Sequence, residues 1–161
     1  MIEARIPDNE EERLLALRAL KILDTMKEER FDRITRLACA SLGVRASAIS
    51  LTDRSRTWVK SIIGLDATES PRAVSFCSHA ILSDKILIVP DASVDPRFSD
   101  NPWVMDNPKI RFYAGYPLST APTLRVGTLC VIDYKPMTLS QEKIDILCDL
   151  GKLAEEELNR Q

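Results

Sequence analysis

One stretch decides how this chain folds: Asp91-Ala-Ser-Val-Asp-Pro-Arg-Phe-Ser-Asp-Asn-Pro-Trp-Val-Met-Asp-Asn-Pro-Lys109, followed by Ile110-Arg-Phe-Tyr-Ala-Gly-Tyr-Pro-Leu118. Three prolines interrupt its first part, so no regular element can run through it. Structureless connections longer than about 12–15 residues are uncommon in compact domains. The stretch also carries apolar residues that argue against disorder: Val94, Phe98, Trp103, Val104 and Met105. We therefore predict that residues 91–109 fold back as a cover over a cavity and lead into a buried strand.

The composition around this stretch is that of one soluble domain. Of 161 residues, 45% are hydrophobic and 29% are charged, and the formal net charge is -2. The basic residues are dispersed among acids, which argues against a nucleic-acid partner. No apolar run approaches the roughly 20 residues of a membrane span, and the N-terminus has no apolar signal core. Four cysteines (Cys39, Cys77, Cys130, Cys148) fit a cytoplasmic protein with free thiols.

The pattern of helices and strands predicts an α+β fold with an antiparallel sheet. Helices are expected over 8–23 (capped by Asp8), over 25–42 (opened by a Thr25–Glu28 capping box and stopped by Gly43), near 75–82 and from Ser140 onward. Strands are expected over 46–52, 57–63, 86–89, 111–118 and 126–132, with a loop over 65–72. Within a single domain 1–161, residues 1–43 form N-terminal helices, 46–133 form the sheet and pocket, and 140–161 form a C-terminal helix.

The last predicted helix has two apolar stripes. One repeats at the spacing of a heptad seam, and its members are Ile144, Leu147, Gly151, Ala154 and Leu158. The other is formed by Ile146, Leu150 and Leu153. One stripe would cover the sheet while the other meets a partner; the alternative is a single wide core face.

Ten residues are candidates for contact with a small molecule in the predicted cavity: Trp58, Phe76, Cys77, His79, Asp91, Arg97, Phe98, Trp103, Arg111 and Tyr113. Each has an alternative role. The aromatic residues can be core, the aspartate can cap a turn, and each arginine can pair with an aspartate instead of an anionic ligand. Cys77 and His79 stand two apart, a spacing that does not bring side chains together on a helix, so a catalytic dyad is not expected. No metal-binding spacing of cysteine and histidine is visible.

Several motifs together resemble the GAF domain, in the subgroup found in bacterial sensor histidine kinases and cyclic-di-GMP signalling proteins. They are Phe76-Cys-Ser-His-Ala-Ile81, Asp95-Pro-Arg-Phe98, Ile110-Arg-Phe-Tyr-Ala-Gly115 and Gly127-Thr-Leu-Cys-Val-Ile-Asp133. The resemblance implies a central antiparallel sheet of about six strands, with the N- and C-terminal helices packed on one face and a ligand pocket on the other.

The same resemblance implies a small-molecule-sensing regulatory domain without catalysis of its own. It also implies a homodimer through the terminal helices and a possible downstream kinase or cyclase domain. Relatives bind bilin, haem or cyclic nucleotides, but no motif for any of these cofactors is visible. Ser78, for example, separates the cysteine from the histidine that bilin-binding relatives place next to each other. Two alternatives stay open. One is a thiol-based redox enzyme or sensor using Cys77, similar to free methionine sulfoxide reductase, and the other is a dimerisation module with a vestigial pocket.

Overall fold

A computed structural model describes residues 1–160 of the chain. Its helices are α1 (Glu10–Ala19), α2 (Glu29–Leu42), α3 (Cys77–Ala80), α4 (Pro102–Met105) and α5 (Gln141–Asn159), with short 3-10 turns η1 (Arg72–Val74) and η2 (Ala92–Val94). Its strands are β1 (Ala46–Thr52), β2 (Arg56–Ile63), β3 (Glu69–Pro71), β4 (Leu87–Val89), β5 (Phe112–Ala121) and β6 (Leu124–Asp133). Gln161, the last residue of the predicted C-terminal helix, lies outside the described residues.

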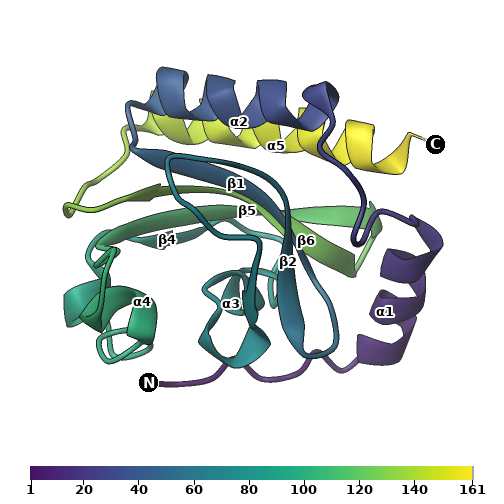
Figure 1. The fold of residues 1–161 in the computed structure, drawn as a ribbon, viewed down its shortest axis with the longest axis horizontal. Helices are drawn as coiled ribbons and strands as arrows, with labels where there is room; N and C mark the ends of the chain where they lie inside the picture. Colours follow the sequence, from purple (N-terminus) through teal and green to yellow (C-terminus); the bar gives the residue numbers. More distant parts are fainter. Residues whose placement is uncertain (161) are drawn as a thin grey trace.

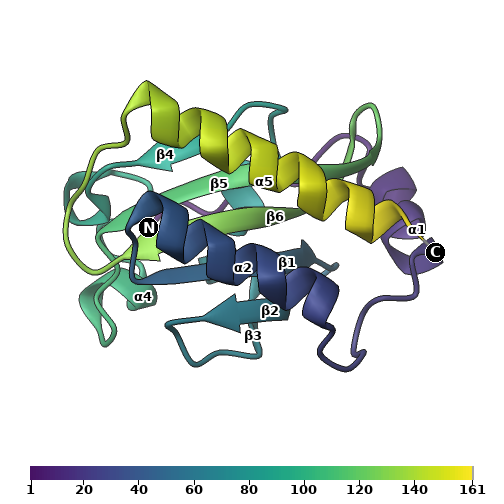
Figure 2. The same cartoon turned by 90° about the horizontal axis from the view of Figure 1, so that it is seen from above.

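The strands form one antiparallel sheet in the order β3-β2-β1-β6-β5-β4. Helices α2 and α5 lie side by side and antiparallel across one face (Figures 1 and 2), where Arg30 near the start of α2 donates to the carbonyl of Glu157 near the end of α5. The short helices α3 and α4 lie on the opposite face, and α1 sits at one end of the sheet (Figure 1). The predicted α+β class and antiparallel sheet are confirmed.

Two apolar clusters fill the two faces. The cluster under α2 and α5 takes large side chains from the central strands, such as Ile49 and Leu51 of β1 and Leu129 of β6. The cluster on the other face takes small ones from the same strands, such as Ala48 and Cys130. Because successive strand residues point to opposite faces, the two clusters follow directly from the alternation of side-chain size.

Several predicted boundaries are confirmed by local chemistry. The strand over 46–52 is β1, and Gly43 ends α2 with a φ of 68°, a left-handed conformation that favours glycine. The Ser140 hydroxyl accepts a hydrogen bond from the backbone N–H of Lys143, as an N-cap residue does.

The predicted helix starts near the N-terminus are wrong. The first helix is Glu10–Ala19 instead of 8–23, and Asp8 does not cap it. The second begins at Glu29 because Thr25 donates its hydroxyl proton to the carbonyl of Ile22 instead of capping. Tertiary contacts also occupy Glu28, whose carboxylate pairs with Lys60.

The loop predicted over 65–72 contains the edge strand β3, so that prediction is also wrong. Strands β5 and β6 extend to Ala121 and Leu124, which leaves a tighter turn than expected between them. The strand predicted as buried over 86–89 is the other edge strand, β4, where only Val89 is fully buried.

The last helix has one wide core face. Its buried residues come from both predicted stripes: Leu147, Leu150, Gly151, Ala154 and Leu158. Of the second stripe, Leu153 is 48% exposed and Ile146 is half-buried. Most of the apolar surface of α5 is therefore used by the sheet and by α2.

A buried charged cluster attaches α1 to the sheet. The carboxylate of Glu10 accepts hydrogen bonds from Arg13 and Arg72, and Arg13 also donates to the carbonyl of Thr52 at the end of β1 (2.7 Å). All three charged side chains are buried. Burial by itself would raise the pKa of Glu10, but the hydrogen bonds from Arg72 and Arg13 outweigh it and lower the pKa to about 2.

The low pKa of Glu10 makes part of the stability depend on pH. The carboxylate stabilises the fold above its unfolded pKa of 4.5, and this contribution is lost as pH falls towards the folded pKa of about 2. We expect Glu10→Gln to lower the free energy of unfolding at neutral pH by about 3–5 kcal/mol, because two buried guanidinium groups lose their counter-charge. Urea unfolding at several pH values should show this difference shrinking between about pH 5 and about pH 2 as the wild-type carboxylate is protonated. The exposed Glu12→Gln is the control, and a pH-independent difference would contradict the argument.

Gly127 of β6 lies where β1 comes close. A Cβ atom there would lie 2.1 Å from the backbone carbonyl oxygen of Ser50. We expect Gly127→Ala to lower the free energy of unfolding by about 1–3 kcal/mol, since the two strands must separate. Denaturant unfolding measures this, with half-buried Ser119→Ala on β5 as the control. Wild-type stability of the glycine variant would show that the strands are not packed this closely.

Candidate functional site

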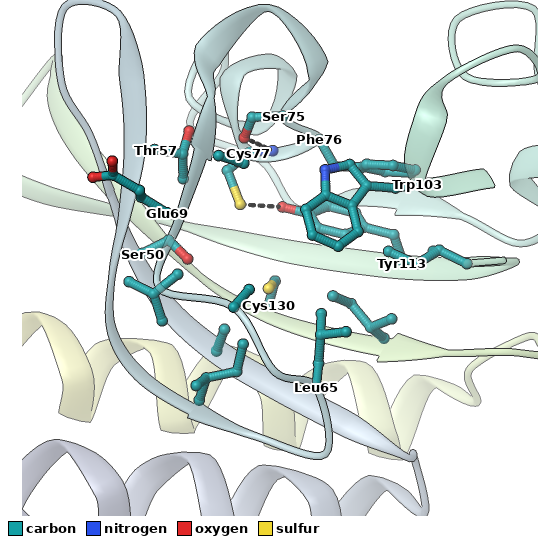
Figure 3. A pocket seen from close by; sticks show the side chains of 17 residues that line it. Ser50, Thr57, Leu65, Glu69, Ser75, Phe76, Cys77, Trp103, Tyr113 and Cys130 are labelled. Atoms are coloured by element: carbon teal, nitrogen blue, oxygen red, sulfur yellow. Dashed lines mark hydrogen bonds between the residues drawn. The ribbon is translucent and has the colours of Figure 1, made fainter. Parts of the chain in front are cut away.

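A cavity of about 70 Å³ lies on the face of the sheet opposite α2 and α5. Its floor comes from β1, β5 and β6, and its walls come from β2, the 65–70 segment, α3 and α4 (Figure 3). The lining residues are Ala48, Ser50, Thr57, Val59, Ile62, Leu65, Ala67, Glu69, Ser70, Ser75, Phe76, Cys77, Trp103, Ile110, Tyr113, Cys130 and Ile132. The predicted side of the sheet therefore has a hollow, although a small one.

Four of the ten sequence candidates line this cavity: Phe76, Cys77, Trp103 and Tyr113. Phe98 lies behind them and stacks on Phe76, with ring centroids 4.3 Å apart. Trp58 belongs to the apolar cluster on the helical face. The alternation of β2 therefore directs it away from the cavity.

The polar candidates outside the cavity have structural partners. Nε2 of His79 is 2.9 Å from the carbonyl oxygen of Ile2. Asp91 accepts from the backbone N–H of Ser93, Arg97 pairs with Asp95, and Arg111 donates to the carbonyl of Val104. Asp91 and Arg97 thus take the cap and ion-pair roles that the sequence left as alternatives, whereas Arg111 bonds backbone carbonyls instead of the expected aspartate.

The 91–109 segment covers the cavity less than predicted. Trp103 is its only lining residue among those described, while Val94 and Met105 are 76% and 61% exposed. Phe98 and Val104 anchor the segment in the second apolar cluster. The opposite wall comes instead from Leu65, Ala67 and neighbouring residues, which the sequence indicated only as a loop.

The sequence held one unused signal for the cavity. The residues of β1 that face it are small, Ala46, Ala48 and Ser50, whereas those facing the helices include Ile49 and Leu51. Small side chains on one face of a central strand leave space above it. The contribution of β3 and the segment before it had no such signal.

The accessible lining of the cavity is almost entirely apolar, although a few polar residues stand along one side. Ser50, Thr57 and Glu69 lie on one side, and Trp103, Tyr113 and Leu65 lie on the other (Figure 3). The hydroxyl oxygen of Thr57 is buried and has no hydrogen-bond partner among residues 1–160. Buried polar groups normally have partners, but this oxygen has almost no accessible surface, so a ligand would reach it only if the wall of the cavity moved.

Cys77 has the most distinctive environment in the cavity. Its Sγ accepts hydrogen bonds from the hydroxyls of Thr128 (3.0 Å) and Tyr113 (3.3 Å). Interactions with the thiol of Cys130, with Thr128 and with Tyr113 lower the pKa of Cys77 despite its burial. Burial raises the pKa of Tyr113 well above its ordinary value, so this group remains a proton donor.

The geometry restricts what can bind. The volume is less than half of the roughly 150 Å³ of an engineered cavity that accepts benzene, so the pocket in this shape does not fit haem, bilin or a cyclic nucleotide. Among residues 1–160, no group of three or more His, Cys, Asp or Glu side chains could hold a metal ion. Nor is any helix in this part of the chain long and apolar enough to cross a bilayer.

Comparisons with known proteins agree on one family. The family model for the GAF domain matches residues 27–158. A cyclic di-GMP phosphodiesterase from Pseudomonas aeruginosa is 43% identical over 130 residues, which are 81% of this chain and 22% of that protein. The chain thus spans about a fifth of the length of this curated relative.

Solved structures show the same fold at low sequence identity. The GAF domain of an Acinetobacter phosphoenolpyruvate-protein phosphotransferase superposes with a TM-score of 0.68 at 16% identity, covering 91% of this chain and 92% of that one. A free methionine-R-sulfoxide reductase from Neisseria meningitidis, in complex with its substrate, gives 0.65 at 15% identity, covering 100% and 98%. At such identities the likeness concerns the fold alone.

Proposed function

This chain belongs to the GAF domain family, and we propose that it is the sensory, regulatory domain of a cytoplasmic bacterial signalling protein, with no catalysis of its own. The observation that carries this proposal is the mainly apolar cavity, which lies across the sheet from α2 and α5. A sensor needs a site that binds a signal molecule and an element that passes the change on. The cavity on one face and the long helices on the other could take these two roles. The family membership supports the signalling role.

The cavity favours a small amphipathic ligand. Trp103, Tyr113 and Leu65 offer apolar contact, while Ser50 is one of the few polar residues of the lining. Ligand sites typically combine mostly apolar walls with a few polar groups in this way. A ligand larger than a few heavy atoms requires the wall at residues 65–70 to move outward, because the cavity holds only about 70 Å³.

The regulated activity belongs to another domain. The cyclic di-GMP phosphodiesterase that this chain resembles is several times longer, and we infer that its likeness to our chain concerns a regulatory segment. The chain would by analogy control a linked cyclic-di-GMP enzyme, a kinase or a cyclase.

A continuous set of contacts offers a route from the cavity to α1. The Ser78 hydroxyl, next to Cys77, donates to the carbonyl of Arg72 (2.8 Å). The guanidinium group of Arg72 donates to Glu10 of α1 and to the carbonyl of Asp53. A shift of α3 on ligand binding would therefore move a residue that holds α1 in place.

The ligand proposal is tested by filling the cavity. Native mass spectrometry of protein purified from its own cells should show a small-molecule adduct, and thermal-shift screening of small amphipathic compounds should identify its class. Ala48→Leu should abolish the adduct but cost little stability, because the added carbons enter the hollow.

The matched control for the cavity is Ala114→Leu on β5, which faces the packed cluster under the helices. It should lower the free energy of unfolding by about 1–3 kcal/mol through overpacking. Equal destabilisation by both changes would show that no cavity exists above β1. Absence of any adduct, together with no stabilising compound, would instead favour a dimerisation module with a vestigial pocket.

We also propose a homodimer through the outer surfaces of α2 and α5. Arg33 and Arg36 leave the outer face of α2 with a net positive charge, although Glu29 pairs with Arg36, and Asp145 and Asp149 make that of α5 acidic. Half-exposed leucines lie on both helices, Leu37 on α2 and Leu153 on α5. A two-fold axis would lay the basic helix of each protomer on the acidic helix of its partner, as a self-complementary interface requires.

Sedimentation velocity tests this dimer. Leu37→Lys and Leu153→Lys should each raise the dimer dissociation constant by at least tenfold, about 1.4 kcal/mol, because each variant buries a lysine in the interface. Leu15→Lys on α1, where the leucine is 70% exposed, is the matched control and should leave association unchanged. A wild-type protein that stays monomeric at all concentrations would rule the dimer out.

A further inference from the structure

Two cysteines meet at the cavity from elements far apart in the sequence. Cys77 comes from α3 and Cys130 from β6, both are buried, and both line the cavity. Thr128, which donates to the sulfur of Cys77, lies two residues before Cys130 on β6, and the close view of the pocket shows the two sulfur atoms on the same side of Trp103 (Figure 3). The arrangement resembles a redox-active dithiol pair. One thiol would react with an oxidant, and the other would attack the oxidised sulfur to form a disulfide.

The surroundings of Cys77 suit the reacting thiol. The hydroxyls of Thr128 and Tyr113 point their protons at its sulfur, and its backbone N–H is held by the Ser75 hydroxyl. Several donors around one sulfur stabilise the thiolate, which is the nucleophilic form. The pKa of Cys130 is raised well above its ordinary value, firstly by its interaction with Cys77 and then by burial, so Cys130 keeps its proton until it is needed.

The remaining cysteines provide an internal comparison. Cys39 on α2 and Cys148 on α5 lie on helices of the opposite face, and burial raises the pKa of each. Among residues 1–160, no hydroxyl group donates a hydrogen bond to the sulfur of Cys39 or of Cys148. Reactivity through thiolate formation should therefore be selective for Cys77.

The cavity also selects the oxidant. A space of about 70 Å³ admits molecules of a few heavy atoms, since one water needs only about 10–15 Å³ on this measure. Hydrogen peroxide or a small alkyl hydroperoxide can reach the sulfur, whereas a peptide disulfide such as oxidised glutathione cannot enter.

We propose that Cys77 and Cys130 form a reversible disulfide when a small hydroperoxide enters the cavity. The Cys77 thiolate attacks one peroxide oxygen, the O–O bond breaks, and the leaving oxygen takes a proton and departs as water or an alcohol. The Cys130 thiol then attacks the resulting sulfenic acid, the S–O bond breaks, and a second water leaves with the thiol proton. Two thiols and one hydroperoxide thus give one disulfide, one water or alcohol, and one further water. A cellular dithiol reverses the reaction by exchange.

The disulfide would change the same contacts that lead to α1. Closing an S–S bond of about 2 Å draws α3 towards β6. Ser78, the next residue of α3, bonds the carbonyl of Arg72, which holds Glu10. Oxidation therefore acts on α1 by a route that needs no bound ligand, and this inference stands apart from the proposed ligand.

The test uses the full chain, reduced and freed of reductant under nitrogen, then exposed to hydrogen peroxide. The intact mass of the protein should fall by the mass of two hydrogen atoms, and peptide mapping should find a disulfide between Cys77 and Cys130. Dithiothreitol should reverse both changes. Cumene hydroperoxide, a bulkier oxidant, should react several-fold more slowly. The Cys39→Ser/Cys148→Ser double variant should react as the wild type does.

Variants of the pair separate the two steps. Cys130→Ser should stop at a sulfenic acid on Cys77 that dimedone labels, and Cys77→Ser should lose no hydrogens. Tyr113→Phe and Thr128→Val should slow disulfide formation several-fold while the slow oxidation of Cys39 keeps its rate. Near-ultraviolet circular dichroism checks that each variant is folded.

Two results would overturn the inference. One is a wild-type protein whose four thiols all survive peroxide at doses that oxidise free cysteine. The other is first oxidation at Cys39 or Cys148. Peptide mapping of the oxidised wild-type protein detects either result, so the test does not depend on whether the variants fold. Neither result affects the native mass spectrometry test of ligand binding.

Discussion

The fold depends on one constraint, the difference in side-chain size between the two faces of β1 and β6. Large residues such as Ile49 and Leu129 face α2 and α5 and build the main core. Small ones such as Ala48 face the other way and leave a hollow that α3, α4 and the 65–70 segment close over. Since alternate strand residues must point to opposite faces, core and cavity are two consequences of one pattern. A change in register of either strand would exchange them.

The close packing of β1 against β6 at Gly127 keeps this register, because no side chain fits there. The second cluster is then closed by contacts between segments far apart in the chain. Phe76 stacks on Phe98, and Asn101 donates to the carbonyl of Val74. The 91–109 segment therefore mainly holds α3 in place by packing against it, and it brings Trp103 to the cavity.

The cavity is the place where several kinds of group meet that the rest of the domain keeps apart. A sulfur atom lies among hydroxyls, beside an aromatic wall and near an unpartnered threonine hydroxyl. Such a mixture stabilises the fold less than a filled core would. This mixture supports the two proposals made for the site, a small amphipathic ligand and a small oxidant. The charged cluster at Glu10 and Arg72 lies within a few contacts of it and connects it to α1.

The sequence by itself determined the class of fold, the positions of β1 and α5, the end of α2, the caps at Gly43 and Ser140, and four of the residues that line the cavity. These rest on periodicity, capping and local motifs, which involve neighbours along the chain. Only the tertiary structure decided that Trp58 faces the helices, that Arg97 and Arg111 have partners in their own segment, and that residues 65–70 form the opposite wall. It also decided that Cys130 of β6 lines the same cavity as Cys77. The physical reason is that side-chain partners are chosen by strand pairing and packing between distant segments, and no local pattern records those distances.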